Sequence, residues 1–224
     1  MVETVPQLSA EHTASSLAMR SHVSAELGDL AAIYDANIEL ISVRPPGNRP
    51  QLDDAVARLV SARGELNAQW SQAPADVETA LSQLSPVADA DLAHGLSELI
   101  ADAAVVLDEL LDCRSVGVRV GLLRKPMCPR FHVDHVPCRM LVTVSGPGTE
   151  WIAHSDLDLH RFEDRSTNEP PLSADGKVRV LPTGAWSLLK GGAWQSAFPG
   201  VVHRSPDREE PRMLVSLDPL FQAP

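Results

Sequence analysis

The stretch Cys128-Pro-Arg-Phe-His-Val-Asp134 places a histidine and an aspartate two residues apart, each next to an apolar residue. In an extended segment, residues i and i+2 point to the same face. The His132 imidazole and the Asp134 carboxylate would therefore project together while their apolar neighbours enter a core. Two such ligands and one later histidine form the two-histidine, one-carboxylate face that leaves open positions on Fe(II). His203, which follows the apolar residues Val201 and Val202, is a suitable third ligand.

Short apolar segments separated by Gly, Pro and Asp surround this motif, a pattern typical of an all-β sandwich or barrel. No helix-length pattern separates them, so a doubly wound α/β fold is excluded. Eight strands are predicted, over residues 116–120, 130–134, 139–145, 150–153, 178–181, 186–190, 197–203 and 212–218. The pattern indicates a double-stranded β-helix, that is, a jelly-roll or cupin-like core. Its second strand would carry the His-x-Asp pair, and its seventh strand would carry the later histidine.

The first half of the chain has the apolar spacing of helices, the clearest of which spans Asp89 to Leu111 with Asp89 as its N-cap. Shorter helices are expected over residues 25–36 and after Pro50, and a strand is expected over residues 37–43. The predicted α+β organisation has three parts, which are a flexible lead-in over residues 1–24, a mostly helical layer over 25–112 and the β core over 113–224.

The formal net charge of −11 over 224 residues argues against a nucleic acid or an anionic membrane as partner, because phosphate groups are bound by clustered Lys and Arg. No run of about 18 apolar residues predicts a spanning helix. The first ten residues lack the basic and apolar regions of a secretory signal. Three cysteines do not suggest a disulfide framework. We therefore expect a cytoplasmic protein that acts on a small molecule or a peptide.

Arg212 opens an apolar predicted strand nine residues after His203, so its side chain would enter the same barrel. A buried guanidinium needs an anion, and its fork of donors suits a bidentate carboxylate. A dicarboxylate cosubstrate could supply that anion while its other end binds the metal. Ser216 shares the face of Arg212 by alternation and could add a hydroxyl. Lys190, in an otherwise apolar strand, either reaches solvent or acts as a second cation for a carboxylate.

Other interpretations of these residues stay open. Arg212 could lie at the surface and pair with one of the two glutamates that closely precede it. His154 and Asp156, with His160, form a second candidate metal group. They begin a polar stretch that is more typical of a solvated loop, which favours the first group as the metal site.

The first histidine-aspartate pair also has alternatives. His132 could be a half-buried, hydrogen-bonded histidine and Asp134 a turn residue. Cys128 and Cys138 flank the pair and could form a thiolate site with His132 or His135. Zinc sites usually have more closely spaced cysteines, such as Cys-x2-Cys. Such a site would make the protein a zinc-binding or sensing module rather than an enzyme.

The order of His-x-Asp, a distant histidine and an arginine on the next strand resembles the iron- and 2-oxoglutarate-dependent dioxygenase superfamily. The superfamily commonly has a serine two residues after the arginine, where this chain has Leu214. A closer resemblance, over about residues 115–219, is to a bacterial family known as a domain of unknown function. Four segments carry that resemblance, namely Cys-Pro-Arg-Phe-His-Val-Asp, Gly-Pro-Gly-Thr-Glu-Trp, Leu-Leu-Lys-Gly and His-Arg-Ser-Pro.

The resemblance implies that His132, Asp134 and His203 bind Fe(II) and that Arg212 anchors 2-oxoglutarate. It also implies a link to metal-handling proteins. We therefore expect a non-haem Fe(II) and 2-oxoglutarate-dependent oxygenase of the hydroxylase type. The alternative is a cupin-like metal-binding protein without turnover, acting in metal or zinc homeostasis or sensing. The two differ at Arg212, because only the enzyme needs an anion clamp beside the metal.

Overall fold

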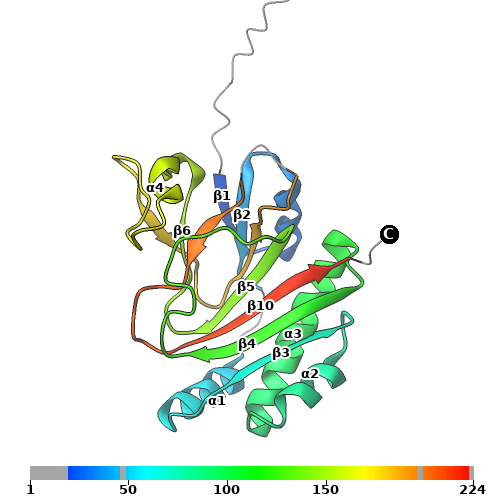
Figure 1. Ribbon diagram of the computed structural model, residues 1–224. Helices are drawn as coiled ribbons and strands as arrows, with labels where there is room; N and C mark the ends of the chain where they lie inside the picture. The colour runs from blue at the N-terminus through cyan, green and yellow to red at the C-terminus, as the bar shows by residue number, and fades with distance from the viewer. Residues whose placement is uncertain (1–19, 46–48, 196–198, 222–224) are drawn as a thin grey trace, which may run out of the picture.

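The computed structural model describes residues 20–45, 49–195 and 199–221, whose strands form two sheets (Figure 1). The larger sheet has the order β1-β2-β8-β5-β10-β4-β3 and the smaller one β7-β6-β9. The larger sheet consists of β1 (Arg20–Ser24), β2 (Ile38–Val43), β3 (Asn67–Gln72), β4 (Ser115–Leu123), β5 (Cys138–Ser145), β8 (Trp186–Lys190) and β10 (Arg212–Leu220). The smaller sheet consists of β6 (Glu150–Ile152), β7 (Val178–Val180) and β9 (Val202–Arg204). The last strand, β10, therefore lies between β4 and β5.

Helices α1 (Pro50–Ser61), α2 (Val77–Leu84) and α3 (Ala90–Leu111) pack on one face of the larger sheet (Figure 1). As predicted, the Asp89 carboxylate caps α3 by accepting a hydrogen bond from the Leu92 amide at 2.9 Å. The apolar stripe of α3 packs against β4 and β10 in the main core. The shorter elements are η1 (Leu27–Tyr34), η2 (His154–Asp156) and α4 (Leu159–Glu163). In the described parts of the chain, no helix is long and apolar enough to cross a membrane.

Strand alternation gives the larger sheet two different faces. On β10, Met213, Val215 and Leu217 enter the main core beneath the helices. The alternate residues Arg212, Leu214 and Ser216 face the other way and line a cavity. The same side of the sheet carries a second apolar cluster that includes residues of both sheets, namely Leu40, Leu141, Trp151, Leu181, Leu189 and Val201. The space next to the smaller sheet is thus part apolar core and part cavity.

Two predicted strands are much shorter than expected. Over residues 130–134 only His132 joins a β-bridge, to His203, and the rest of the segment is irregular. Proline has no backbone N–H for a ladder, and Pro129 and Pro137 limit pairing on both sides of this segment. The strand predicted over residues 197–203 is represented by β9, while residues 196–198 lie outside the described residues.

The N-terminal half is not only helical, because β2 and β3 join the larger sheet. Strand β2 was predicted, whereas β3 has only a weak apolar alternation. It is an edge strand, and its outward residues Asn67, Gln69 and Ser71 are exposed. The expected lead-in is also shorter, since its residues 20–24 form β1 beside β2. Its residues 1–19 lie outside the described residues.

Glu39 on β2 is an acidic side chain with only 1% exposure. Its Oε2 accepts a hydrogen bond from the His154 amide at 3.1 Å, while its Oε1 is buried without a hydrogen-bond partner. Burial raises the pKa of Glu39 to about 7, although the His154 amide and the charge of Arg179 act in the opposite direction. The folded protein therefore keeps a proton on Glu39 at pH values where the unfolded chain has lost it.

We predict that Glu39→Gln stabilises the protein at alkaline pH. The folded pKa of about 7 lies above the ordinary value of 4.5, so the wild-type free energy of unfolding falls as pH rises between these values. One pKa unit corresponds to about 1.4 kcal/mol, so the gain should approach about 3 kcal/mol at pH 8 and vanish near pH 4.5. Urea unfolding across this range measures it. The exposed Glu65→Gln is the control, and an equal effect of Glu39→Gln at both pH values would contradict the prediction.

Candidate metal centre

The candidate site begins with a reciprocal pair of backbone hydrogen bonds between His132 and His203. The His132 amide donates to the His203 carbonyl at 3.0 Å, and the His203 amide donates to the His132 carbonyl at 2.9 Å. The two imidazole rings consequently lie with their centroids 4.6 Å apart. Phe131 and Val133 belong to an apolar cluster with Ile152. The alternation predicted for this segment therefore holds locally, although the segment is not a regular strand.

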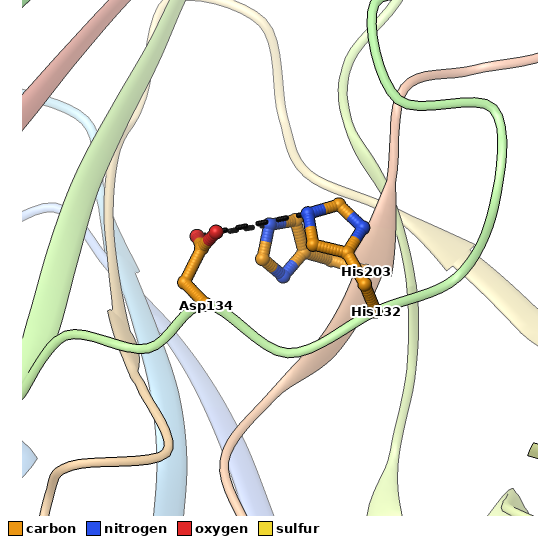
Figure 2. A group of neighbouring side chains, drawn as sticks. All are labelled: His132, Asp134 and His203. Carbon is orange, nitrogen blue, oxygen red and sulfur yellow. Dashed lines mark ion pairs between the residues drawn. The ribbon is translucent and has the colours of Figure 1, made fainter. Parts of the chain in front are cut away.

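Asp134 completes a group of three possible ligands, because one ligand atom from each of His132, Asp134 and His203 lies within 4.8 Å of the others. The His203 Nε2 is 3.2 Å from Asp134 Oδ2, and the His132 Nε2 is 3.6 Å from Asp134 Oδ1. Figure 2 shows the two rings and the carboxylate turned toward one another. The structure brings together the three residues that the sequence predicted.

Both histidines are oriented by their Nδ1 atoms. The Nδ1 of His132 is 2.9 Å from the Arg130 carbonyl, and the Nδ1 of His203 is 3.0 Å from the Val201 carbonyl. Since a carbonyl oxygen only accepts, Nδ1 must donate, and in the neutral ring this leaves the Nε2 lone pair free to bind a metal. Hydrogen bonds of this kind are the usual support of a metal-binding histidine.

Arg139, on β5, holds the carboxylate of the group. Its Nη1 is 2.8 Å from Asp134 Oδ2, while its Nε and Nη2 bind the two oxygens of Asp218 at 2.6 and 2.7 Å. Asp134 Oδ2 is buried and, despite the ion pair, makes no aligned hydrogen bond, so it keeps ligand capacity. Burial alone would raise the pKa of Asp134, but the His132 and His203 side chains and the Arg139 charge hold it well below its ordinary range. Sequence patterns gave no signal for Arg139, because its partner Asp218 is 79 residues away.

Two glycines hold the Asp134 loop close to the end of β8. The Gly191 amide donates to the Pro137 carbonyl, and the Gly192 amide donates to the Asp134 carbonyl, each at 2.8 Å. A Cβ at residue 191 would lie 2.0 Å from the Val136 carbonyl oxygen, so only glycine permits this approach. The turn after β8 therefore sets the position of the loop that carries Asp134.

The three possible ligands line a cavity of about 270 Å³ together with Arg212 and Ser216. Arg212 is only 3% exposed, and its Nη2 donates to the Thr149 hydroxyl at 2.9 Å. Its Nε and Nη1 are buried without a hydrogen-bond partner, and burial lowers the pKa of the guanidinium to about 10. Among the residues the structure describes, no carboxylate pairs with it. The alternative of a surface arginine paired with Glu209 or Glu210 is therefore wrong.

Thr149 is a further cavity residue that the sequence analysis did not single out. It lies in the segment Gly-Pro-Gly-Thr-Glu-Trp, one of the four segments that resemble the domain-of-unknown-function family, but its spacing did not predict a site residue. Its hydroxyl is the one described hydrogen-bond partner of the Arg212 guanidinium. A threonine hydroxyl is neutral, so this contact leaves the charge of Arg212 without compensation.

The structure does not bring Lys190 to this cavity. Lys190 is 1% exposed, its Nζ donates to the Asp35 carbonyl at 2.8 Å, and it lies 5.4 Å from the Trp194 ring centroid. Strand parity explains this position, because Lys190 shares the face of Leu188, which enters the main core beneath the helices. Lys190 thus neither reaches solvent nor joins Arg212.

The other candidate groups do not assemble. Asp156 pairs with Arg179, and His160 is exposed on α4. Cys128 lines the cavity, whereas Cys138 lies in the main core, where burial raises the pKa of its thiol to about 12. Within the described ranges, His132, Asp134 and His203 form the one cluster of His, Cys, Asp or Glu side chains that could hold a metal.

Comparison with solved structures identifies the fold. The chain aligns with the dioxygenase for auxin oxidation from rice at a TM-score of 0.55 and 14% identity, covering 89% of this chain and 82% of the other. It aligns with dioxygenase for auxin oxidation 1 from Arabidopsis thaliana, solved as a complex with 2-oxoglutarate, at a TM-score of 0.51 and 13% identity, covering 92% and 94%. The protein thus shares the double-stranded β-helix fold of these two dioxygenases.

Within this fold class, the chain belongs to a defined sequence family. Residues 24–218 match the family described as "Protein of unknown function (DUF1826)". The match includes all three possible metal ligands and Arg212. No curated protein matches the sequence. The predicted resemblance to a domain-of-unknown-function family with the oxygenase fold is confirmed.

We predict that alanine at His132, Asp134 or His203 abolishes stoichiometric Co(II) binding, because each change removes one of three converging ligand atoms. Isothermal titration calorimetry of the metal-free protein measures the binding, and circular dichroism checks that the fold persists. His154→Ala, Asp156→Ala and a Cys128→Ser/Cys138→Ser variant are the controls, which should bind Co(II) like the wild type. Loss of the metal in these variants but not in the first three would place the site elsewhere.

We predict that Arg139→Met lowers the free energy of unfolding of the metal-free protein by about 2 to 4 kcal/mol, since it leaves two partly buried carboxylates without their cation. Urea unfolding at pH 7 measures the change. Arg208→Gln, at an exposed arginine, is the control. A loss below about 0.5 kcal/mol would mean that the Asp134–Arg139–Asp218 contacts behave like a surface ion pair.

Proposed function

We propose that this protein is a non-haem Fe(II) and 2-oxoglutarate-dependent oxygenase. The observation that carries the proposal is Arg212, a buried guanidinium with two unpartnered nitrogen atoms in the same cavity as the possible metal ligands. A buried charge without a partner is costly, so such a side chain indicates a bound anion. A metal-binding protein without turnover has no need of an anion clamp beside its metal.

The residues present fit an iron ion. His132 and His203 would supply Nε2 ligands and Asp134 a carboxylate oxygen, which is the donor set of non-haem Fe(II) oxygenases. The free Nε2 lone pairs and the unbonded Asp134 Oδ2 are the atoms that such an ion would satisfy. When bound, the iron would supply O2 chemistry and a binding site for the 2-oxo acid end of the cosubstrate.

The side chains around the cavity would place the cosubstrate. Arg212 would bind the distal carboxylate of 2-oxoglutarate through one of its unpartnered nitrogens together with the second N–H of Nη2, and Thr149 would hold the guanidinium in place through the first N–H of Nη2. Ser216 lies on the same face of β10 and would offer a hydroxyl. Leu214, between these two residues along the strand, and Leu141 give the cavity apolar walls that limit the entry of water.

The comparisons support the proposal at the level of the fold. The Arabidopsis thaliana structure is a complex with 2-oxoglutarate, and it shares this fold at 13% identity. At that identity the fold alone is common to the two proteins. The assignment of reaction and cosubstrate to this chain rests on its own residues, above all on Arg212.

We predict that Arg212→Met weakens 2-oxoglutarate binding by roughly 10- to 150-fold, the equivalent of about 1.5 to 3 kcal/mol for one charge-assisted interaction. Metal affinity should stay nearly unchanged, because Arg212 is not a ligand. The measurement is anaerobic titration of the Fe(II) protein with 2-oxoglutarate, following the visible metal-to-ligand charge-transfer band.

The exposed Arg208→Gln is the matched control, which should titrate like the wild type. If the wild-type protein binds Fe(II) but develops no such band at millimolar 2-oxoglutarate, the cosubstrate assignment is wrong. The cupin-like metal-binding function without turnover would then replace the oxygenase proposal.

A further inference from the structure

The cavity is strongly cationic in its side chains, although the chain as a whole carries a net charge of −11. Four arginines line it, namely Arg119, Arg139, Arg204 and Arg212, whereas Asp134 is the one acidic residue among the lining residues. Arg139 is paired with Asp134 and Asp218. Arg204 is paired with Glu150, its Nε lying 2.8 Å from Glu150 Oε2. Two of the four guanidinium charges, those of Arg119 and Arg212, are left without an acidic partner among the described residues.

Arg119 is held on the cavity side of β4 by strand alternation. Its neighbours on the strand, Val118 and Val120, enter the main core, while Arg119 and Gly121 line the cavity. Across the sheet it lies opposite Ser216 on β10, and Ser216 in turn lies opposite Leu141 on β5. Arg119 is therefore half-buried in the cavity wall, on the strand next to the one that carries Arg212.

Among the described residues, no acid near this wall is available to Arg119. The Asp134 carboxylate faces His132, His203 and Arg139. Asp218, one alternation step along β10 from Ser216, gives both of its oxygens to Arg139. On the other side of β4, the residue opposite Arg119 is the neutral Gln69 of β3. An anion that binds Arg119 in this wall would therefore come from a bound molecule.

The cosubstrate cannot supply that anion. 2-Oxoglutarate has two carboxylates, and the proposed function assigns one to the metal and the other to Arg212. We propose that the substrate of this enzyme is an organic anion whose carboxylate or phosphate binds Arg119; the inference rests on the proposed function. The planar fork of a guanidinium matches either group with two parallel hydrogen bonds.

The rest of the substrate is apolar and small. The apolar lining residues of the cavity include Leu123, Met127, Leu141 and Leu214, and the whole cavity measures about 270 Å³. Figure 1 shows β4, which carries Arg119, and the edge strand β3 at the side of the larger sheet away from β6 and α4. An anionic head on Arg119 would let the apolar body lie toward the possible metal ligands.

Binding of three six-carbon probes tests the inference: hexanoate, hexyl phosphate and the neutral hexanamide. Their dissociation constants are measured by ligand-observed NMR on the metal-free protein and on the Co(II) protein with 2-oxoglutarate. At least one of the two anions should bind the wild type more tightly than hexanamide, and the tighter of the two names the head group. Arg119→Gln should weaken binding of that anion by roughly 10- to 150-fold and leave hexanamide unchanged. Arg119→Lys should retain part of the preference, because it keeps the charge and loses the fork.

Two results would overturn the inference. One is that neither anion binds more tightly than hexanamide at millimolar concentration. The other is that the preference survives Arg119→Gln, which would place the anion on another cation. Arg208→Gln is the control for a general loss of positive charge, and it should bind all three probes like the wild type. Circular dichroism checks that Arg119→Gln retains the fold.

Arg212→Met separates this inference from the proposed function. It should weaken 2-oxoglutarate binding and keep the anion preference, whereas Arg119→Gln should keep the charge-transfer band with 2-oxoglutarate and lose the preference. If the band never forms but the anion preference still depends on Arg119, the cosubstrate proposal fails and the anion site stands. If the band forms and no preference exists, the anion site fails and the cosubstrate proposal stands.

Discussion

The reciprocal backbone hydrogen bonds between His132 and His203 are the interaction on which the candidate site depends. They join an irregular loop between β4 and β5 to β9 of the smaller sheet, and they set the two imidazoles side by side. The loop is held from its other end by the turn after β8, where the close approach of the chain requires glycine at residue 191. Backbone contacts thus set the positions of the two histidines. Each imidazole is then oriented by one local hydrogen bond, from Nδ1 to the carbonyl two residues earlier in the chain.

Asp134 is placed by charge rather than by backbone pairing alone. Arg139 bridges it to Asp218, so a loop residue is tied to β5 and β10 of the larger sheet. Because Arg139 pairs with the carboxylates of Asp134 and Asp218, neither carboxylate is available to another arginine of the cavity. Arg119 and Arg212 are left facing a space in which no described carboxylate pairs with them. The cavity of an acidic protein is therefore suited to anionic molecules, and one network of ion pairs accounts for both the ligand position and the local charge.

Sequence patterns predicted the possible metal ligands and Arg212, but not the residues that hold these side chains in place. The spacing of His132 and Asp134 put both on one side even in an irregular segment, because their apolar neighbours occupy the opposite side. The alternation on β10 correctly placed Arg212 with Ser216 in one cavity. Arg139 and Thr149 were missed, since their partners lie 79 and 63 residues away. Edge strand β3 was missed because its inward face carries only two apolar residues, Ala68 and Trp70, before the polar Gln72, so the apolar alternation is weak.

Local spacing alone settled the capped helix α3, the strand β2 and the ligand pair, because each depends on residues within a few positions of one another. The side of the sheet on which Lys190 lies was decided only by tertiary structure. Every residue of β8 is buried, on both faces, so its sequence shows no alternation that marks the face toward the cavity. The same holds for the pairing of the arginines. A guanidinium is charged wherever it lies, and whether a carboxylate reaches it depends on which distant strands the fold brings together.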